Sequence, residues 1–135
     1  MDMFIWDEKY KVGILEFDEQ HKKIISIINM LYEKMKSGKE KEAISVSLEE
    51  LIEYINYHFE AEEKLFSEYA YHHKGQHMKE HEKIRNKIIE FKLSFDNGQV
   101  VVDDILVNFL KEWLDYHIIE NDKKYESFFN KKGIK

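Results

Sequence analysis

The sequence contains no cysteine, no proline, only five glycines in 135 residues, and no long apolar run. Without cysteine there is no disulfide, thiolate metal site or thiol nucleophile, so any metal must be bound by nitrogen and oxygen atoms. Without proline, long helices can continue uninterrupted, because no backbone donor is missing from their hydrogen-bond ladder. No apolar stretch reaches roughly 18 residues, so we expect no membrane-spanning helix.

Charge and composition narrow the class of protein further. The net charge is −6 and basic residues form no extended block, which argues against a nucleic-acid partner. The hydrophobic content of 43% is typical of a folded globular chain. The first eight residues include acids and no sustained apolar run, so they do not resemble a signal peptide. We therefore predict a single domain, residues 1–135, located in the cytoplasm.

Apolar residues recur at the three- and four-residue spacing of amphipathic helices along four stretches of the chain. The predicted helices cover approximately residues 18–37, 40–66, 73–95 and 101–119. Their predicted inward residues are Ile24, Ile25, Ile28, Leu31, Tyr32 and Met35; Ile44, Leu48, Leu51, Ile55, Phe59 and Leu65; Ile84, Ile88, Phe91 and Phe95; and Val102, Leu106, Phe109, Leu110 and Trp113. Asp18 is the predicted N-cap of the first helix. Ser37-Gly38 and Asp96-Asn97-Gly98 are stop signals.

Two segments flank these helices. Residues 1–17 lack a clear helical period and are predicted to lie over the fold as an arm. Residues 122–131 are predicted to form a short final helix. Four amphipathic helices joined by short connections pack as antiparallel neighbours. The predicted fold is therefore all-α, an antiparallel up-down-up-down four-helix bundle with an N-terminal arm and a short C-terminal helix.

Such a bundle would bring most of the seven histidines together. The starts of the first and third helices and the ends of the second and fourth lie at one end of the bundle. His21, His58, His77, His81 and His117 all fall near that end on the apolar stripes, with Glu62 four residues after His58. Buried polar groups without partners cost about 1–3 kcal/mol each, and protein donors alone would hardly satisfy this set. The pattern therefore predicts a metal site.

The number of ligands indicates two ions. Five histidines, Glu62 and one further carboxylate are too many ligands for a single ion. The further carboxylate should lie near His117, and the candidates are Glu112, Asp115, Glu120 and Asp122. Spacing does not choose among them, and Asp122 would reach the site only if the helix loosens or ends after Ile119. Imidazole and carboxylate ligands suit iron, zinc, copper or nickel.

The combined pattern resembles the signature of the hemerythrin family. It consists of His21, His58-x-x-x-Glu62, His77-x-x-x-His81 and His117-x-x-x-x-Asp122. Val12-Gly13-Ile14, Phe17-Asp18-Glu19-Gln20-His21, His58-Phe59, Glu62-Glu63 and Trp113-Leu114-x-x-His117-Ile118 resemble the bacterial branch in particular. The likeness extends from near Trp6 to Asp122, and myohemerythrin, an example of the up-down bundle, belongs to the same family.

One position departs from the family pattern. Members often have proline after the tyrosine that precedes the third helix, whereas Tyr71 is followed here by His72. His73 also lies four residues before His77, so a shifted register would make His73 a ligand. The distance from Tyr71 to His77 is the usual one, which favours His77.

The resemblance implies two non-haem iron ions joined by a bridging oxo or hydroxo group. His77, His81 and His117 would bind one iron, and His21 and His58 would bind the other. Glu62 and Asp122 would bridge them, which leaves one coordination position open on the second iron. Because neutral imidazoles dominate, cleavage of the O–O bond should be disfavoured. The implied function is reversible binding of dioxygen as peroxide, for oxygen binding, storage or delivery, and not enzymatic turnover.

A dry pocket should surround the open position and exclude water. Its predicted lining is Ile24, Phe59, Trp113, Ile118 and Ile119. Three alternatives stay open at this point. The protein could be a di-iron redox enzyme that handles peroxide or nitric oxide or supplies iron for the repair of other centres. It could be a sensor whose oxidation state is read by an unidentified protein partner, or it could hold zinc or manganese.

Overall fold

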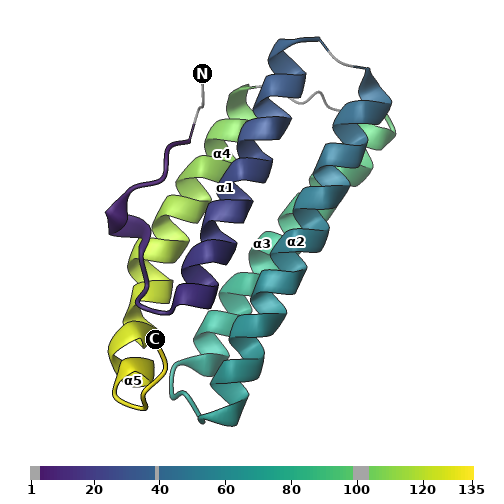
Figure 1. Ribbon diagram of the computed structural model, residues 1–135. Helices are drawn as coiled ribbons and strands as arrows, with labels where there is room; N and C mark the ends of the chain where they lie inside the picture. The colour runs from purple at the N-terminus through teal and green to yellow at the C-terminus, as the bar shows by residue number, and fades with distance from the viewer. Residues whose placement is uncertain (1–3, 39, 99–103) are drawn as a thin grey trace.

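The computed structural model describes residues 4–38, 40–98 and 104–135, and the regular structure in these ranges is all helical. The four long helices are α1 (Leu15–Lys36), α2 (Lys41–Glu68), α3 (Lys74–Asp96) and α4 (Asp104–Tyr116). Figure 1 shows them as an elongated bundle with α1 beside α4 and α2 beside α3. This confirms the predicted all-α four-helix bundle. Within the described ranges, no helix has both the length and the apolar character needed to cross a membrane.

The predicted apolar stripes form the core. The residues that are buried are Ile24, Ile25, Ile28, Leu31, Leu48, Leu51, Ile55, Phe59, Ile84, Ile88, Phe95, Leu106 and Leu110. Those that are partly buried against them are Tyr32, Met35, Ile44, Leu65, Phe91, Phe109 and Trp113. Val102 lies outside the described residues. Burying a large aliphatic side chain contributes roughly 1.5–3 kcal/mol, so these stripes hold the helices together and position one end of the bundle.

The ends of the first three helices agree with their predicted positions to within a few residues. Gly38 and Gly98, just after α1 and α3, have φ angles of +68° and +75°, which glycine adopts without steric cost. The prediction that Asp18 caps the first helix was wrong. The helix begins at Leu15 after Ile14, and the Asp18 carboxylate accepts a hydrogen bond from the Val12 backbone N–H at 2.7 Å. The carboxylate satisfies a donor of the arm, because the arm folds back over the first turn of α1.

The chain after α4 is less regular than predicted. The α-helical part ends at Tyr116, earlier than the expected residue 119. A π-helix, η2 (His117–Asn121), follows directly and leads into a 3₁₀ helix, η3 (Asp122–Tyr125). A short α-helix, α5 (Glu126–Asn130), completes the predicted C-terminal helical segment. The predicted start of the fourth helix, residues 101–103, lies outside the described residues.

The N-terminal arm lies over the bundle as predicted. It contains one 3₁₀ turn, η1 (Glu8–Tyr10), and buries Phe4, Tyr10 and Val12. Asn29 of α1 holds the arm through two hydrogen bonds. Its Oδ1 accepts from the Phe4 N–H at 2.9 Å, and its Nδ2 donates to the Phe4 carbonyl at 2.8 Å. Gly13 has a φ of +78°, which glycine adopts without steric cost, and a Cβ atom there would lie 2.6 Å from Glu126 Cγ and displace that side chain.

Candidate metal centre

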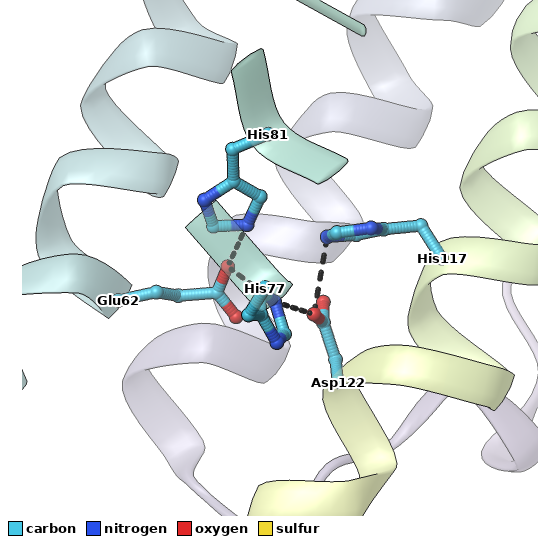
Figure 2. Close-up of side chains that lie close together, drawn as sticks. All are labelled: Glu62, His77, His81, His117 and Asp122. Carbon is cyan, nitrogen blue, oxygen red and sulfur yellow. Dashed lines mark ion pairs between the residues drawn. The ribbon is translucent and has the colours of Figure 1, made fainter. Parts of the chain in front are cut away.

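One end of the bundle gathers the seven predicted ligands from five elements. They are His21 on α1, His58 and Glu62 on α2, His77 and His81 on α3, His117 on η2 and Asp122 on η3. All seven side chains are buried, with exposures of 0–4%. Figure 2 shows Glu62, His77, His81, His117 and Asp122 pointing toward one another. The convergence follows from the helix stripes, because residues three or four apart share a helix face.

The seven residues form two overlapping groups, and each group could hold a metal ion. In the larger group, one nitrogen or oxygen atom from each of Glu62, His77, His81, His117 and Asp122 lies within 4.8 Å of all the others. In the smaller group, the same holds for His21, His58, Glu62 and Asp122. The two carboxylates are common to both groups. The centre is therefore divided into a three-histidine half and a two-histidine half.

Distances within the centre show how the carboxylates are shared. Asp122 Oδ1 lies 2.8 Å from His77 Nε2 and 3.1 Å from His117 Nε2, whereas Asp122 Oδ2 lies 3.0 Å from His21 Nε2. Glu62 Oε1 lies 3.2 Å from His81 Nε2 and 3.3 Å from His58 Nε2. Each carboxylate thus faces histidines of both halves.

The π-helix explains how Asp122 reaches the centre. In an ideal α-helix, a residue five positions after His117 lies off the His117 face. Across η2 the Asp122 backbone N–H donates to the His117 carbonyl, a spacing of five residues, which returns Asp122 to that face. This is the loosening that the sequence required for Asp122. Of the other three candidates, Glu112 and Glu120 are exposed, and Asp115 is partly exposed beside Lys9.

The atoms that face the middle of the centre have no hydrogen-bond partner in the protein. They are the Nε2 atoms of all five histidines, Glu62 Oε1 and both carboxylate oxygens of Asp122. The histidine Nε2 atoms and the carboxylate oxygens are close enough for ion pairs. Their angles are not those of hydrogen bonds, because the atoms all point toward one shared space. Such a set would cost about 1–3 kcal/mol per buried group if nothing bound there. The donor set fits non-haem iron, which accepts imidazole and carboxylate ligands.

The charges of the centre also fit a cation. Burial alone would raise the pKa of Asp122, but the neighbouring histidines, His117 first, hold it well below its usual range. Burial and Asp122 likewise raise the pKa of Glu62, and His58 and the other histidines outweigh them and lower it to about 2. Both shared carboxylates are therefore ionised in a buried site, where a bound cation would compensate their charge.

The pKa values of two histidines, one from each half, shift in opposite directions. Burial lowers the pKa of His58 to about 3, so its imidazole is neutral. Burial also acts to lower the pKa of His81, but its contacts with Glu62 and Glu63 outweigh burial and raise that pKa to about 9. Without a metal, His81 therefore holds a proton that a bound cation must displace.

Three residues outside the two groups hold the ligands in place. With Nε2 facing the centre, the Nδ1–H of His58 donates to Gln20 Oε1 at 2.5 Å, and the Nδ1–H of His81 donates to Glu63 Oε2 at 2.7 Å. The Tyr125 hydroxyl donates to Glu62 Oε2 at 2.5 Å. Partners of this kind fix the tautomer and orientation of metal ligands.

Sequence patterns did not reveal the role of these three residues. Gln20 and Glu63 directly neighbour His21 and Glu62 in the motifs that resemble the hemerythrin family. This adjacency was the only indication in the sequence that they lie near the centre. Each orients a histidine from a different helix, however, so the pairing depends on how the helices pack. Tyr125 follows the irregular turns η2 and η3, and nothing in the spacing indicated where its hydroxyl would point.

Aromatic rings pack directly on the three-histidine half. Phe59 stacks on His81 with ring centroids 3.7 Å apart and an interplanar angle of 6°. Trp113 lies over His117 with centroids 5.4 Å apart at 27°. Of the other predicted pocket residues, Ile24 and Ile118 are fully buried and Ile119 is partly buried. The role of these five residues as an oxygen pocket stays a prediction.

The two surface histidines near the centre belong to neither group. His72 and His73 are exposed at the start of α3. His77 and His81, one and two turns further along, supply the inward imidazoles. The structure thus agrees with the register that uses His77.

Comparison with known proteins places these features in a family. The sequence-family model named hemerythrin HHE cation binding domain matches residues 12–128 of this chain. The chain is 35% identical over 125 residues to a bacteriohemerythrin from Pseudomonas paraeruginosa, covering 93% of this chain and 80% of that protein. It is 32% identical over 123 residues to a hemerythrin-like protein from Naegleria gruberi, covering 91% of both.

Solved structures agree with the sequence relatives. A wild-type hemerythrin crystal structure is similar with a TM-score of 0.88 and 27% sequence identity, covering 93% of this chain and 96% of that one. A point variant of a hemerythrin is similar with a TM-score of 0.90 and 26% identity, covering 94% and 97%. The family match over residues 12–128 includes every element that carries a predicted ligand. The chain therefore belongs to the hemerythrin family.

Proposed function

We propose that this protein binds dioxygen reversibly at a pair of non-haem iron ions. His77, His81 and His117 would hold one iron, and His21 and His58 would hold the other. Glu62 and Asp122 would bridge the two, together with an oxo or hydroxo group. The observation that carries this proposal is the pair of overlapping ligand groups, three histidines against two, around shared carboxylates whose oxygens face both halves.

The unequal halves favour one open position. If both carboxylates and one oxygen bridge were shared, three histidines would complete six ligands on one iron, whereas two histidines would complete only five on the other. The His21–His58 half is therefore where an external ligand has room. An iron pair bound across both halves would supply two electrons for the reversible reduction of dioxygen.

The surrounding side chains favour binding over turnover. Phe59 stacks on His81, Trp113 covers His117, and Ile118 is fully buried beside His117. These apolar groups exclude water from the three-histidine half, and on the other half Phe17 packs edge-on against His58 with ring centroids 5.9 Å apart. The Tyr125 hydroxyl, which could serve as a proton donor, is already engaged by Glu62. Five imidazole ligands against two carboxylates also contrast with ferritin-like centres, which use more carboxylates. We therefore propose an oxygen-binding protein and not an enzyme.

An absorption spectrum recorded through cycles of oxygen exposure and removal tests this function. The iron-loaded protein should show a ligand-to-iron charge-transfer band in air that bleaches on deoxygenation and returns when air is readmitted. The zinc-loaded protein is the matched control and should stay colourless. An iron-loaded protein whose spectrum does not respond to dioxygen, or responds only once, would contradict reversible binding.

A further inference from the structure

The buried centre comes closest to solvent at His77. Its exposure is 4%, whereas the other six predicted ligands are exposed by at most 1%. His77 forms part of a surface hollow of about 10 Å³, lined also by Tyr71, His73, Gln76 and Lys124. This is about the volume that a single water molecule or small ion occupies. The hollow therefore connects the outside with one ligand of the three-histidine half.

The corner between α2 and α3 places Tyr71, whose hydroxyl has no partner, in the wall of this hollow. Ala70 adopts a φ of +51°, and the Tyr71 N–H donates to the Phe66 carbonyl at 3.0 Å, which closes α2 and turns the chain inward. The Tyr71 side chain is only 3% exposed, yet its hydroxyl has no hydrogen-bond partner in the protein. A buried hydroxyl without a partner is costly, so a polar or ionic ligand bound in the hollow would stabilise this group.

Two imidazoles lead from the surface to the centre. His73 and His77 are four residues apart at the start of α3, where the His77 N–H donates to the His73 carbonyl at 3.0 Å. Residues at this spacing share a helix face, and both side chains line the hollow. His73 is exposed and His77 is buried. Together with the Gln76 amide and the Tyr71 hydroxyl, they offer the nitrogen and oxygen ligands that divalent iron accepts.

We propose that this hollow is a transient site for a divalent metal ion, and that iron reaches the centre through it. The ion would first bind His73, Tyr71 and Gln76 and would then pass to His77. This inference rests on the proposed function, because it assumes that the centre takes up iron. Lys124 stands in the wall of the hollow, and its positive charge opposes a cation. Removal of the imidazole at position 73 and reversal of the charge at position 124 should therefore change the rate of uptake in opposite directions.

The test uses metal-free protein mixed rapidly with Co²⁺, whose absorption reports binding by histidine. His73→Ala should slow uptake by roughly tenfold, the lower end of the losses seen when metal-site partners are removed. Lys124→Glu should speed uptake by roughly tenfold, the lower end of electrostatic effects on association. Because His73 is the N-cap of α3, His73→Asn is a second variant that removes the imidazole but keeps a good capping residue.

Matched controls separate the hollow from general effects of charge and folding. His72→Ala removes the adjacent exposed imidazole, which lines a neighbouring hollow that shares only Lys124 with the first, and it should load at the parent rate. Lys83→Glu makes the same change in charge ten residues beyond His73, about 15 Å along α3, and should have little effect. Parent-like rates in both His73 variants, or equal slowing by His72→Ala, would overturn the proposed route.

The final stoichiometry separates this inference from the proposed function. We expect two ions per chain in the parent and in every variant. The rate of uptake should change only for the variants at positions 73 and 124. Two ions per chain with unaltered rates would remove the route and leave the centre intact. Fewer than two ions per chain in the parent would instead contradict the two-iron centre.

Discussion

The two halves of the centre are supported by different outer partners. On the three-histidine half, His81 donates to a carboxylate, Glu63, and is covered by Phe59. On the two-histidine half, His58 donates to a neutral amide, Gln20, whose own Nε2 donates to Glu16 at 3.4 Å. A carboxylate partner makes an imidazole more basic, and hence a stronger ligand, than an amide does. The halves therefore differ in the strength of their ligands as well as in number.

Under the proposed function, this difference would let a single small bundle separate retention of metal from exchange of ligand. The three-histidine half has more protein ligands, a charged outer partner and stacked aromatic rings, all of which favour a closed and firmly bound ion. The two-histidine half has fewer ligands and an uncharged outer partner. The proposed oxygen-binding position belongs to this second half.

Removal of a shared carboxylate should have the largest effect, because it belongs to both halves. Glu62→Ala should lose bound iron from both, since each half then lacks a ligand and Tyr125 loses its acceptor. Elemental analysis should find well under two irons per chain. Glu60→Ala, at an exposed position on the same helix, is the matched control and should retain the parent content. Two irons per chain in Glu62→Ala would show that this carboxylate is not shared.

Changes to the outer partners should have smaller effects, confined to one half. Glu63→Gln should weaken binding of the ion on the three-histidine half by about 10–100-fold, because His81 loses its charged partner. Gln20→Glu should strengthen binding of the ion on the two-histidine half, because it gives His58 a carboxylate partner. Competition with a chelator, followed by counting the ions that remain, measures both. An equal loss from both halves in Glu63→Gln would argue against separate support.

The Tyr125 hydroxyl should contribute a still smaller amount, and mainly to stability. Tyr125→Phe leaves Glu62 Oε2 without its buried donor, so the free energy of unfolding should fall by about 1–3 kcal/mol. Urea unfolding of the metal-free protein measures this change. Tyr116→Phe, which alters an exposed tyrosine of α4, should have almost no effect. A loss of the same size in both variants would mean that the hydroxyl of Tyr125 has no special role.

The pH dependence of the metal-free protein should show the two halves acting in opposite directions. The pKa of His58 is lowered from 6.5 to about 3, so its contribution is present above pH 6.5 and is lost as the pH falls toward 3. The pKa of His81 is raised from 6.5 to about 9, so its contribution is present below pH 6.5 and is lost as the pH rises through 9. Urea unfolding from acidic to alkaline pH should show losses on both sides. Glu63→Gln should reduce the loss on the alkaline side only.

The regular part of the centre could be predicted from the sequence. His58 and Glu62, and His77 and His81, are each four residues apart on an apolar stripe, and helix geometry alone places such pairs inward. The antiparallel order of four helices then brings His21 and His117 to the same end. These inferences needed only local periodicity and the up-down arrangement, which the fold confirms.

The irregular parts could not be predicted in the same way. Spacing left four acidic candidates near His117, because the π-helix that turns Asp122 inward has no sequence signal of its own. Asp18 was assigned to the wrong partner, since its acceptor role depends on how the arm folds back. Gln20, Glu63 and Tyr125 act across helices or turns, and such contacts depend on packing that periodicity does not describe.

Diffraction from crystals of the iron-loaded protein, recorded at the iron absorption edge, tests the central claim most directly. We predict two anomalous peaks per chain, both between Glu62 and Asp122. One peak should be bound by His77, His81 and His117 and the other by His21 and His58. A single peak, or two peaks with equal numbers of histidines, would contradict the unequal two-iron centre.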